Sequence, residues 1–177
     1  MDERLYHDLP KQGWLSLAEA ELLWKTAKQT KGPILEVGCY YGKSTCLLAA
    51  LGRPIYAVDP FSDFDDCDFS GAKIKEGFLM NLRARDIYNV TLFHERIEDW
   101  EPRPVGFAYL DGNHTYDGTK QQIRKAKECR PKAIGIHDVN DTGEGIVVKQ
   151  AAKGMLGPWT NRVERLAVWL DSASPFA

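Results

Sequence analysis

The sequence predicts an α/β protein of three layers, in which a mostly parallel sheet carries helices on both faces. Two observations lead to this prediction. Short apolar segments of strand type alternate along the chain with longer segments whose apolar residues recur at helical spacing. Polar residues gather directly after the apolar segments, as they do where parallel strands end at one edge of a sheet. The 177 residues suffice for one such domain, which we expect to span 1–177.

The first 31 residues form a helical extension that precedes the alternating pattern. Ser16-Leu17-Ala18-Glu19 is a capping box, in which Ser and Glu satisfy each other's free backbone N–H groups at a helix start. The predicted helix runs to Gln29, because Gly32-Pro33 stops it. We expect this helix to pack on the edge of the sheet or to form a homodimer.

The body of the chain supplies the remaining strands and helices. Apolar runs of four to six residues, rich in Val, Ile, Phe and Tyr, predict buried strands of a parallel sheet. The last strand is expected to be antiparallel. Asp117 is the predicted N-cap of the third body helix, which ends before Pro131. The predicted strands are 34–37, 55–58, 90–93, 105–110, 133–136 and 163–170; the predicted helices are 43–51, 71–85, 118–130 and 145–153.

An acidic and aromatic loop at 61–70 interrupts the pattern. It lacks the glycine that a calcium loop of the EF-hand type requires at its sixth position, so a solvated acidic loop is the favoured interpretation. Because it follows a strand end, it is also a candidate lid whose aromatic rings contact substrate. The acidic residues are Asp63, Asp65, Asp66 and Asp68, and the aromatic residues are Phe61, Phe64 and Phe69.

Composition excludes several classes of function. With 23 basic against 25 acidic residues and no basic run, the sequence lacks the concentration of positive charge that is typical of nucleic-acid binding. No stretch is apolar for 18 residues and the N-terminus opens charged, so neither a membrane span nor a secretion signal is expected. The four cysteines show no Cys-x-x-Cys spacing, which disfavours a zinc site or a disulfide framework. We therefore expect a cytoplasmic protein.

The most informative motif follows the strand at 34–37. Glycines at 38 and 42 let the backbone approach a ligand, and the next helix begins at once with free N–H groups. Asp59 lies 21 residues beyond Gly38, at the end of the next strand, where a carboxylate can accept hydrogen bonds from a ribose. A dinucleotide site has the tighter Gly-x-Gly-x-x-Gly spacing, whereas the residue two after Gly38 is Tyr40. The motif thus predicts a bound nucleoside.

This loop resembles that of class I S-adenosylmethionine-dependent methyltransferases, which have a Rossmann-like fold. The pattern Glu-x-Gly-x-Tyr-x-Gly-x-Ser is similar to that of catechol O-methyltransferase and its relatives. The resemblance implies S-adenosyl-L-methionine as cofactor and places the adenine beside the end of the strand at 90–93. The cofactor-binding residues so implied are Glu36, Gly38, Tyr40, Gly42, Ser44, Asp59, Glu95, Arg96 and Asp111.

A second motif follows the strands at 105–110 and 133–136. Asp111-Gly112-Asn113-His114 and the later His137-Asp138 resemble the macrolide-sugar O-methyltransferases, and the likeness covers roughly 33–140. The resemblance implies that the carboxylate of Asp111 helps to hold a divalent metal and that His114 is the catalytic base. The implied metal ligands are Asp111, Asp138 and His137, of which His137 departs from the Asp-Asn pair of the catechol enzymes.

The chemistry of methyl transfer to oxygen calls for the same groups. A hydroxyl is a poor nucleophile until it loses its proton, so a base within reach of the oxygen accelerates the reaction. Mg²⁺ prefers oxygen ligands, which two carboxylates and a substrate diol can supply. The sequence therefore predicts an O-methyltransferase that acts on a small sugar, polyketide-like or phenolic acceptor with the help of Mg²⁺. A metal-independent enzyme that uses His114 alone stays open as an alternative, as do an NAD-dependent oxidoreductase and a non-catalytic nucleoside-binding domain.

Overall fold

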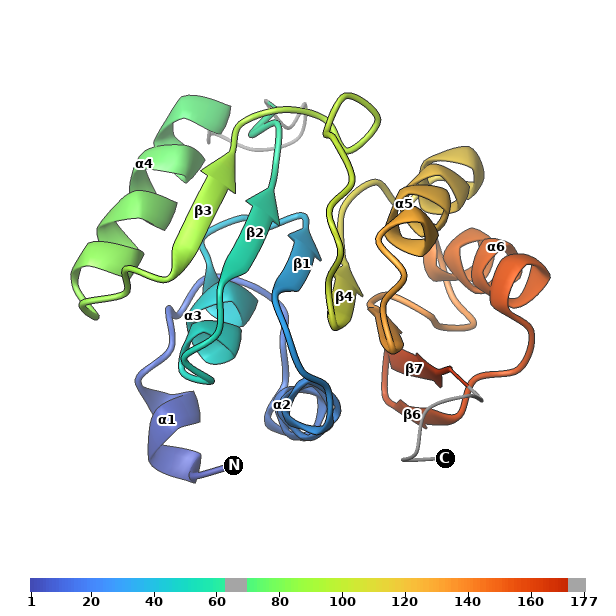
Figure 1. The fold of residues 1–177 in the computed structure, drawn as a ribbon, viewed down its shortest axis with the longest axis horizontal. Helices are drawn as coiled ribbons and strands as arrows, with labels where there is room; N and C mark the ends of the chain where they lie inside the picture. Colours follow the sequence, from blue (N-terminus) through green and yellow to red (C-terminus); the bar gives the residue numbers. More distant parts are fainter. Residues whose placement is uncertain (63–69, 172–177) are drawn as a thin grey trace.

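A computed structural model of the protein describes residues 1–62 and 70–171 and has the predicted α/β architecture (Figure 1). Seven strands form one sheet in the order β3-β2-β1-β4-β5-β7-β6. Strands β1 to β5 are parallel to one another, and β7 is antiparallel to both β5 and β6. The strands are β1 (Ile34–Val37), β2 (Ile55–Val58), β3 (Val90–Phe93), β4 (Phe107–Leu110), β5 (Ala133–Ile136), β6 (Asn161–Val163) and β7 (Leu166–Leu170).

Helices cover both faces of the sheet, and alternate residues of each strand enter two separate cores. In β4, Phe107 and Tyr109 pack with α2, α3 and α4, whereas Ala108 and Leu110 pack with α5 and α6. This alternation follows from the pleat of a strand, whose successive side chains point to opposite faces. The helices are α1 (Glu3–His7), α2 (Leu17–Gln29), α3 (Lys43–Ala49), α4 (Gly71–Arg83), α5 (Tyr116–Glu128) and α6 (Gly145–Leu156).

The N-terminal extension packs on the sheet. Packing on the sheet edge and homodimer formation were the two arrangements expected from the sequence. The capping box at the start of α2 is confirmed: Ser16 Oγ accepts from the Glu19 backbone N–H at 3.2 Å, and Glu19 Oε2 accepts from the Ser16 N–H at 3.0 Å. Residues Ala20, Leu23 and Ala27 are fully buried on the face turned to the sheet. The short helix α1 was not predicted, because five residues are too few to show a helical period.

The four body helices end two or three residues from their predicted ends, and two larger differences concern the N-cap of α5 and the last strand. The N-cap of α5 is Thr115, whose Oγ1 accepts from the Gly118 N–H at 3.1 Å, so Asp117 lies within the first turn instead. The predicted last strand is two strands, β6 and β7, joined by a two-residue turn at Glu164 and Arg165. Such turns are usually announced by Asn-Gly or a similar pair, and Glu-Arg gives no such signal although Glu164 adopts a φ of 49°.

The start of strand β4 also differs from the prediction. Strand β4 begins at Phe107 rather than at residue 105, while Val105 donates its N–H to the Cys129 carbonyl.

Most of the candidate lid, including Phe64 and Phe69, lies outside the residues that the structure describes. Phe61 is described, and it is buried beside Phe78. Within 1–62 and 70–171, no helix is long and apolar enough to cross a membrane.

Candidate active site

The loop between β1 and α3 adopts a backbone that its glycines make possible. Gly38 and Gly42 have φ values of 82° and 84°, in the left-handed region that favours glycine. A side chain at Gly38 would collide with the backbone of Asp111 and Gly112, so the loop after β1 and the loop after β4 lie in direct contact. Tyr40 shares the left-handed conformation, with φ 49°. This conformation of the loop therefore depends on glycine at position 38 and on the close approach of the loop after β4.

Asp59 fastens this loop to the end of β2. Its Oδ2 accepts hydrogen bonds from the backbone N–H groups of Cys39 at 2.6 Å and Tyr40 at 3.1 Å, and its Oδ1 accepts from Phe61 at 2.7 Å. Both carboxylate oxygens thus have partners within the protein, and Oδ1, which accepts only one hydrogen bond, keeps a further lone pair for a ligand. The ribose contact expected of Asp59 remains a prediction, to which the structure adds the role of loop anchor.

Glu36 lies beneath the loop and is fully buried. Burial raises the pKa of Glu36 to about 8, although the hydrogen bond that Ser44 Oγ donates to Oε1 at 2.5 Å acts in the opposite direction. Its Oε2 has no hydrogen-bond partner among the described residues. A carboxyl group in this setting is protonated at neutral pH.

Glu36→Gln is expected to make the free protein more stable at pH 8 than the parent and to change little at pH 5. The folded-state pKa lies above the unfolded value of 4.5, so the contribution of Glu36 to stability is fully present below pH 4.5 and is lost as the pH rises toward 8. The stabilising effect of the substitution should grow by about 3 kcal/mol between pH 5 and pH 8. Urea denaturation at the two pH values measures it, and equal effects at both would show that Glu36 is ionised at pH 5.

Two cavities meet at the loops after β1 and β4. The smaller, of about 350 Å³, reaches from Gly38 past Asp59 to Arg96 and Glu98. The larger, of about 720 Å³, includes Tyr116 of α5 and Val147 of α6 in its lining. Five residues line both: Gly38, Tyr40, Asp111, Gly112 and Asn113.

The structure brings most of the predicted cofactor residues to these cavities. Gly38, Tyr40, Ser44, Asp59, Arg96 and Asp111 are among the lining residues. Glu36 lies below the surface, Gly42 begins α3 against the ring of Phe78, and Glu95 lines neither cavity. Beside Arg96, the lining instead includes Ile97 and Glu98, which the sequence interpretation missed.

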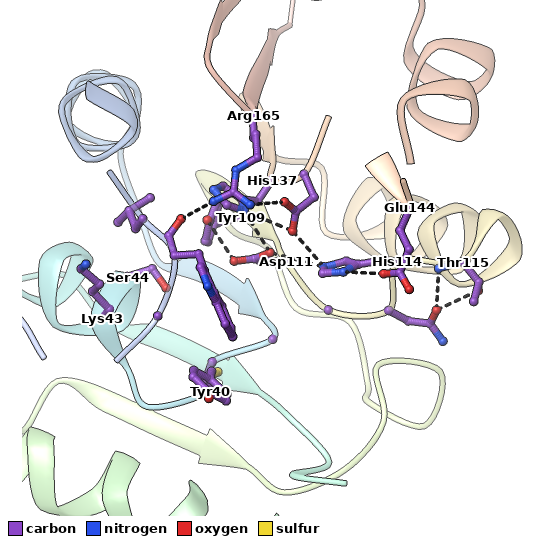
Figure 2. Close-up of a pocket in the computed structure, with 18 of the residues that line it drawn as sticks. Tyr40, Lys43, Ser44, Tyr109, Asp111, His114, Thr115, His137, Glu144 and Arg165 are labelled. Atoms are coloured by element: carbon purple, nitrogen blue, oxygen red, sulfur yellow. Dashed lines mark hydrogen bonds and ion pairs between the residues drawn. The ribbon is translucent and has the colours of Figure 1, made fainter. Parts of the chain in front are cut away.

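Two carboxylates and two imidazoles form a cluster in the larger cavity (Figure 2). His114 Nε2 lies 3.6 Å from Asp111 Oδ1 and 3.4 Å from Asp138 Oδ2. His137 Nδ1 lies 3.4 Å from the same two oxygens. The His114 side chain is a third exposed, and the Asp111 carboxylate beside it raises its pKa. The positions predicted from the strand ends thus converge in space.

His137 lies among three carboxylates. It is buried, and its Nε2 faces the equally buried carboxylate of Glu19 at 3.3 Å. Burial lowers the pKa of His137, but the three surrounding carboxylates outweigh it and raise the pKa to about 12. An imidazolium donates from both ring nitrogens, which suits the carboxylates on its two sides; the metal-ligand role expected of His137 remains a prediction. The described atoms that can share an ion belong to Asp111, His114 and Asp138.

Glu19 and Arg165 complete the cluster, and sequence reasoning missed both as site residues. Arg165 Nη1 donates to Asp138 Oδ1 at 3.0 Å, its Nη2 donates to the Trp14 carbonyl at 2.9 Å, and its backbone N–H donates to Glu19 Oε1 at 3.0 Å. Glu19 was assigned only to the capping box. Because the partners of Glu19 and Arg165 are up to 151 residues away along the chain, no local pattern in the sequence indicates them.

The fold and the site together define the class of protein. The chain matches the family model described as a methyltransferase domain over residues 35–139, which is more than half of its length, so it belongs to that family. The match covers the loops after β1, β2, β4 and β5. The chain therefore carries a methyltransferase domain. Among curated proteins, none matches it.

Solved structures share the fold across nearly the whole chain. CalS11, a TDP-rhamnose 3′-O-methyltransferase of calicheamicin biosynthesis, is 17% identical with a TM-score of 0.61, over 96% of this chain and 91% of that one. TomG, an O-methyltransferase of Streptomyces achromogenes involved in tomaymycin synthesis and solved with S-adenosylmethionine, is 17% identical with a TM-score of 0.62, over 89% and 79%. Cofactor-bound Rv0187 from MTB is 15% identical with a TM-score of 0.66, over 95% and 86%.

Proposed function

We propose that the protein transfers the methyl group of S-adenosylmethionine to a hydroxyl oxygen of a small molecule. The observation that supports this proposal best is the position of His114. Its Nε2 is buried in the wall of the larger cavity and has no hydrogen-bond partner among the described residues. This cavity adjoins the smaller one, and the two share the lining residues Gly38, Tyr40, Asp111, Gly112 and Asn113. The lining of the smaller cavity suits the nucleoside. An acceptor in the larger cavity thus meets both the base and the methyl donor.

His114 acts as the general base in this proposal. As the acceptor oxygen attacks the methyl carbon, the carbon–sulfur bond of the sulfonium breaks and S-adenosylhomocysteine leaves. The hydroxyl proton passes to His114 Nε2, and the product is a methyl ether. The carboxylates of Asp111 and Asp138, within 3.6 Å of Nε2, stabilise the imidazolium that forms. Much of the remaining acceleration comes from holding oxygen, methyl and sulfur in line.

The carboxylates of Asp111 and Asp138 also suit a divalent metal. One oxygen of each belongs to the group of described atoms that lie within 4.8 Å of one another, and carboxylate oxygens are the ligands that Mg²⁺ prefers. His114 Nε2 is in the same group, but Mg²⁺ prefers oxygen ligands, so we assign the metal to the two carboxylates and the base to His114. When bound, Mg²⁺ would lower the pKa of the acceptor hydroxyl. The metal-independent form of the reaction needs only His114.

Isothermal titration tests the cofactor assignment. S-Adenosylmethionine and S-adenosylhomocysteine are expected to bind with micromolar Kd, whereas NAD is expected not to bind. Each titration is run with Mg²⁺ and again with EDTA. Binding of NAD alone would favour an oxidoreductase and contradict the proposal. Binding of the nucleosides without turnover of any hydroxyl acceptor would favour a non-catalytic binding domain.

Turnover in EDTA separates the two forms of the proposal. We expect EDTA to abolish methyl transfer to ring diols such as catechol and methyl α-L-rhamnopyranoside, and excess Mg²⁺ to restore it. Undiminished turnover in EDTA would select the metal-independent enzyme. Either result leaves the methyl transfer itself in place.

A further inference from the structure

Two loops of the site share one sequence pattern. Asn-x-Thr-x-x-Gly occurs at 113–118 after β4 and again at 140–145 after β5. Each copy leads into a helix, α5 and α6 respectively. The first copy contains His114 at its second position, and the second copy contains Glu144 at its fifth.

The same hydrogen bonds fix both loops. Asn113 Oδ1 accepts from the N–H and hydroxyl of Thr115 at 2.9 and 2.7 Å, and Asn140 Oδ1 accepts from those of Thr142 at 2.8 and 3.3 Å. In each copy, a side chain on the closing glycine would collide with the asparagine. Each loop is therefore built tightly onto the first turn of its helix.

The packing of α5 against α6 places the two loops face to face. His114 Nδ1 lies 3.5 Å from Glu144 Oε2, and Figure 2 shows His114 between Glu144 on one side and Asp111 on the other. The opposite ring nitrogen, Nε2, is the buried atom without a hydrogen-bond partner. The two nitrogens of His114 thus have different surroundings: Nδ1 faces the exposed carboxylate of Glu144, whereas Nε2 faces the carboxylates of Asp111 and Asp138, which we assign to the metal.

We propose that Glu144 is a positioning residue for His114: its carboxylate accepts the Nδ1–H and so leaves the lone pair on Nε2, directed toward the acceptor hydroxyl. A neutral imidazole carries one N–H, and the partner of one nitrogen decides which nitrogen is free to accept a proton. The present 3.5 Å separation is longer than a hydrogen bond, as contacts of catalytic groups often are before the substrate binds. The proposal rests on the base role of His114 proposed above.

Glu144→Gln tests this role without threatening the fold, because the Glu144 side chain is 77% exposed. The expected result is a kcat lower by about 10-fold or more, with catechol or methyl α-L-rhamnopyranoside as acceptor. The KM for the acceptor and the Kd for S-adenosylhomocysteine should stay within about twofold, because Glu144 acts through His114 rather than by binding.

The matched control is Asp141→Asn, which neutralises another exposed acid of the same loop. Asp141 pairs with Lys149 and lies outside the cavity lining, so its loss should leave kcat unchanged. If Glu144→Gln has the kcat of Asp141→Asn while His114→Ala is inactive, the Glu144 proposal is wrong and the proposed function stands. If His114→Ala keeps full turnover, the base assignment fails and the Glu144 proposal fails with it.

A second readout needs no acceptor. ¹⁵N NMR of the side chain in complex with S-adenosylhomocysteine, at alkaline pH where the ring is neutral, reports which nitrogen of His114 carries the proton; His114→Ala assigns the signals. The proposal predicts Nδ1–H in the parent and in Asp141→Asn, and a changed tautomer in Glu144→Gln. The same tautomer in all three proteins, or Nε2–H in the parent, would overturn it.

Discussion

Replacing His114 with alanine is expected to lower kcat for methyl transfer by about 10²-fold or more, the contribution that a general base typically makes. The variant removes the ring nitrogen that lies between Asp111 and Asp138 and that we propose accepts the hydroxyl proton. Because the proposed base acts on the acceptor rather than the nucleoside, the Kd for S-adenosylhomocysteine should change little. Steady-state kinetics with a ring diol and titration of the cofactor product measure the two effects separately.

His7→Ala is the control for this experiment, since His7 is an exposed histidine of α1 that lines neither cavity. It should keep the kcat of the parent. A kcat within twofold of the parent in His114→Ala would remove His114 from the mechanism. A loss of cofactor affinity as large as the loss of kcat would assign His114 to binding.

Gly38→Ala is expected to destabilise the protein by about 3 kcal/mol or more and to weaken cofactor binding by at least about 10-fold. Two costs combine. A residue with a Cβ is strained at a φ of 82°, and the added carbon collides with the backbone of Asp111 and Gly112. Relief of the collision moves the loops after β1 and β4 apart, and both line the cavities that meet there. Urea denaturation and titration with S-adenosylmethionine measure the two losses.

Gly52→Ala separates strain from collision. Gly52 also has a positive φ, of 70°, but nothing lies within 4 Å of the place where a side chain would be. Its substitution should cost only the backbone strain, about 1 kcal/mol, and leave cofactor binding unchanged. If Gly38→Ala loses no more stability than Gly52→Ala, the contact between the two loops does not constrain them.

Local patterns in the sequence were sufficient for most of the fold. The strands at 34–37, 55–58, 90–93 and 133–136 have the predicted bounds, because each is a short apolar run between residues that break a strand. The capping box of α2 was equally clear, since its two hydrogen bonds join residues only three apart. The hairpin of β6 and β7 was not predicted, because the turn residues Glu-Arg lack the Asn-Gly type of signal that usually marks a hairpin turn.

The sequence also determined which residues gather at the site, since parallel strands deliver Gly38, Asp59, Asp111 and Asp138 to one edge of the sheet whatever their detailed packing. Only the tertiary structure decided what each does there. His137 is paired with Glu19, and His114 lies beside Glu144; both pairs join elements that meet only when the sheet and its helices have packed. The charge state of an imidazole depends on such neighbours, and proximity in space between distant segments has no local signature in the chain.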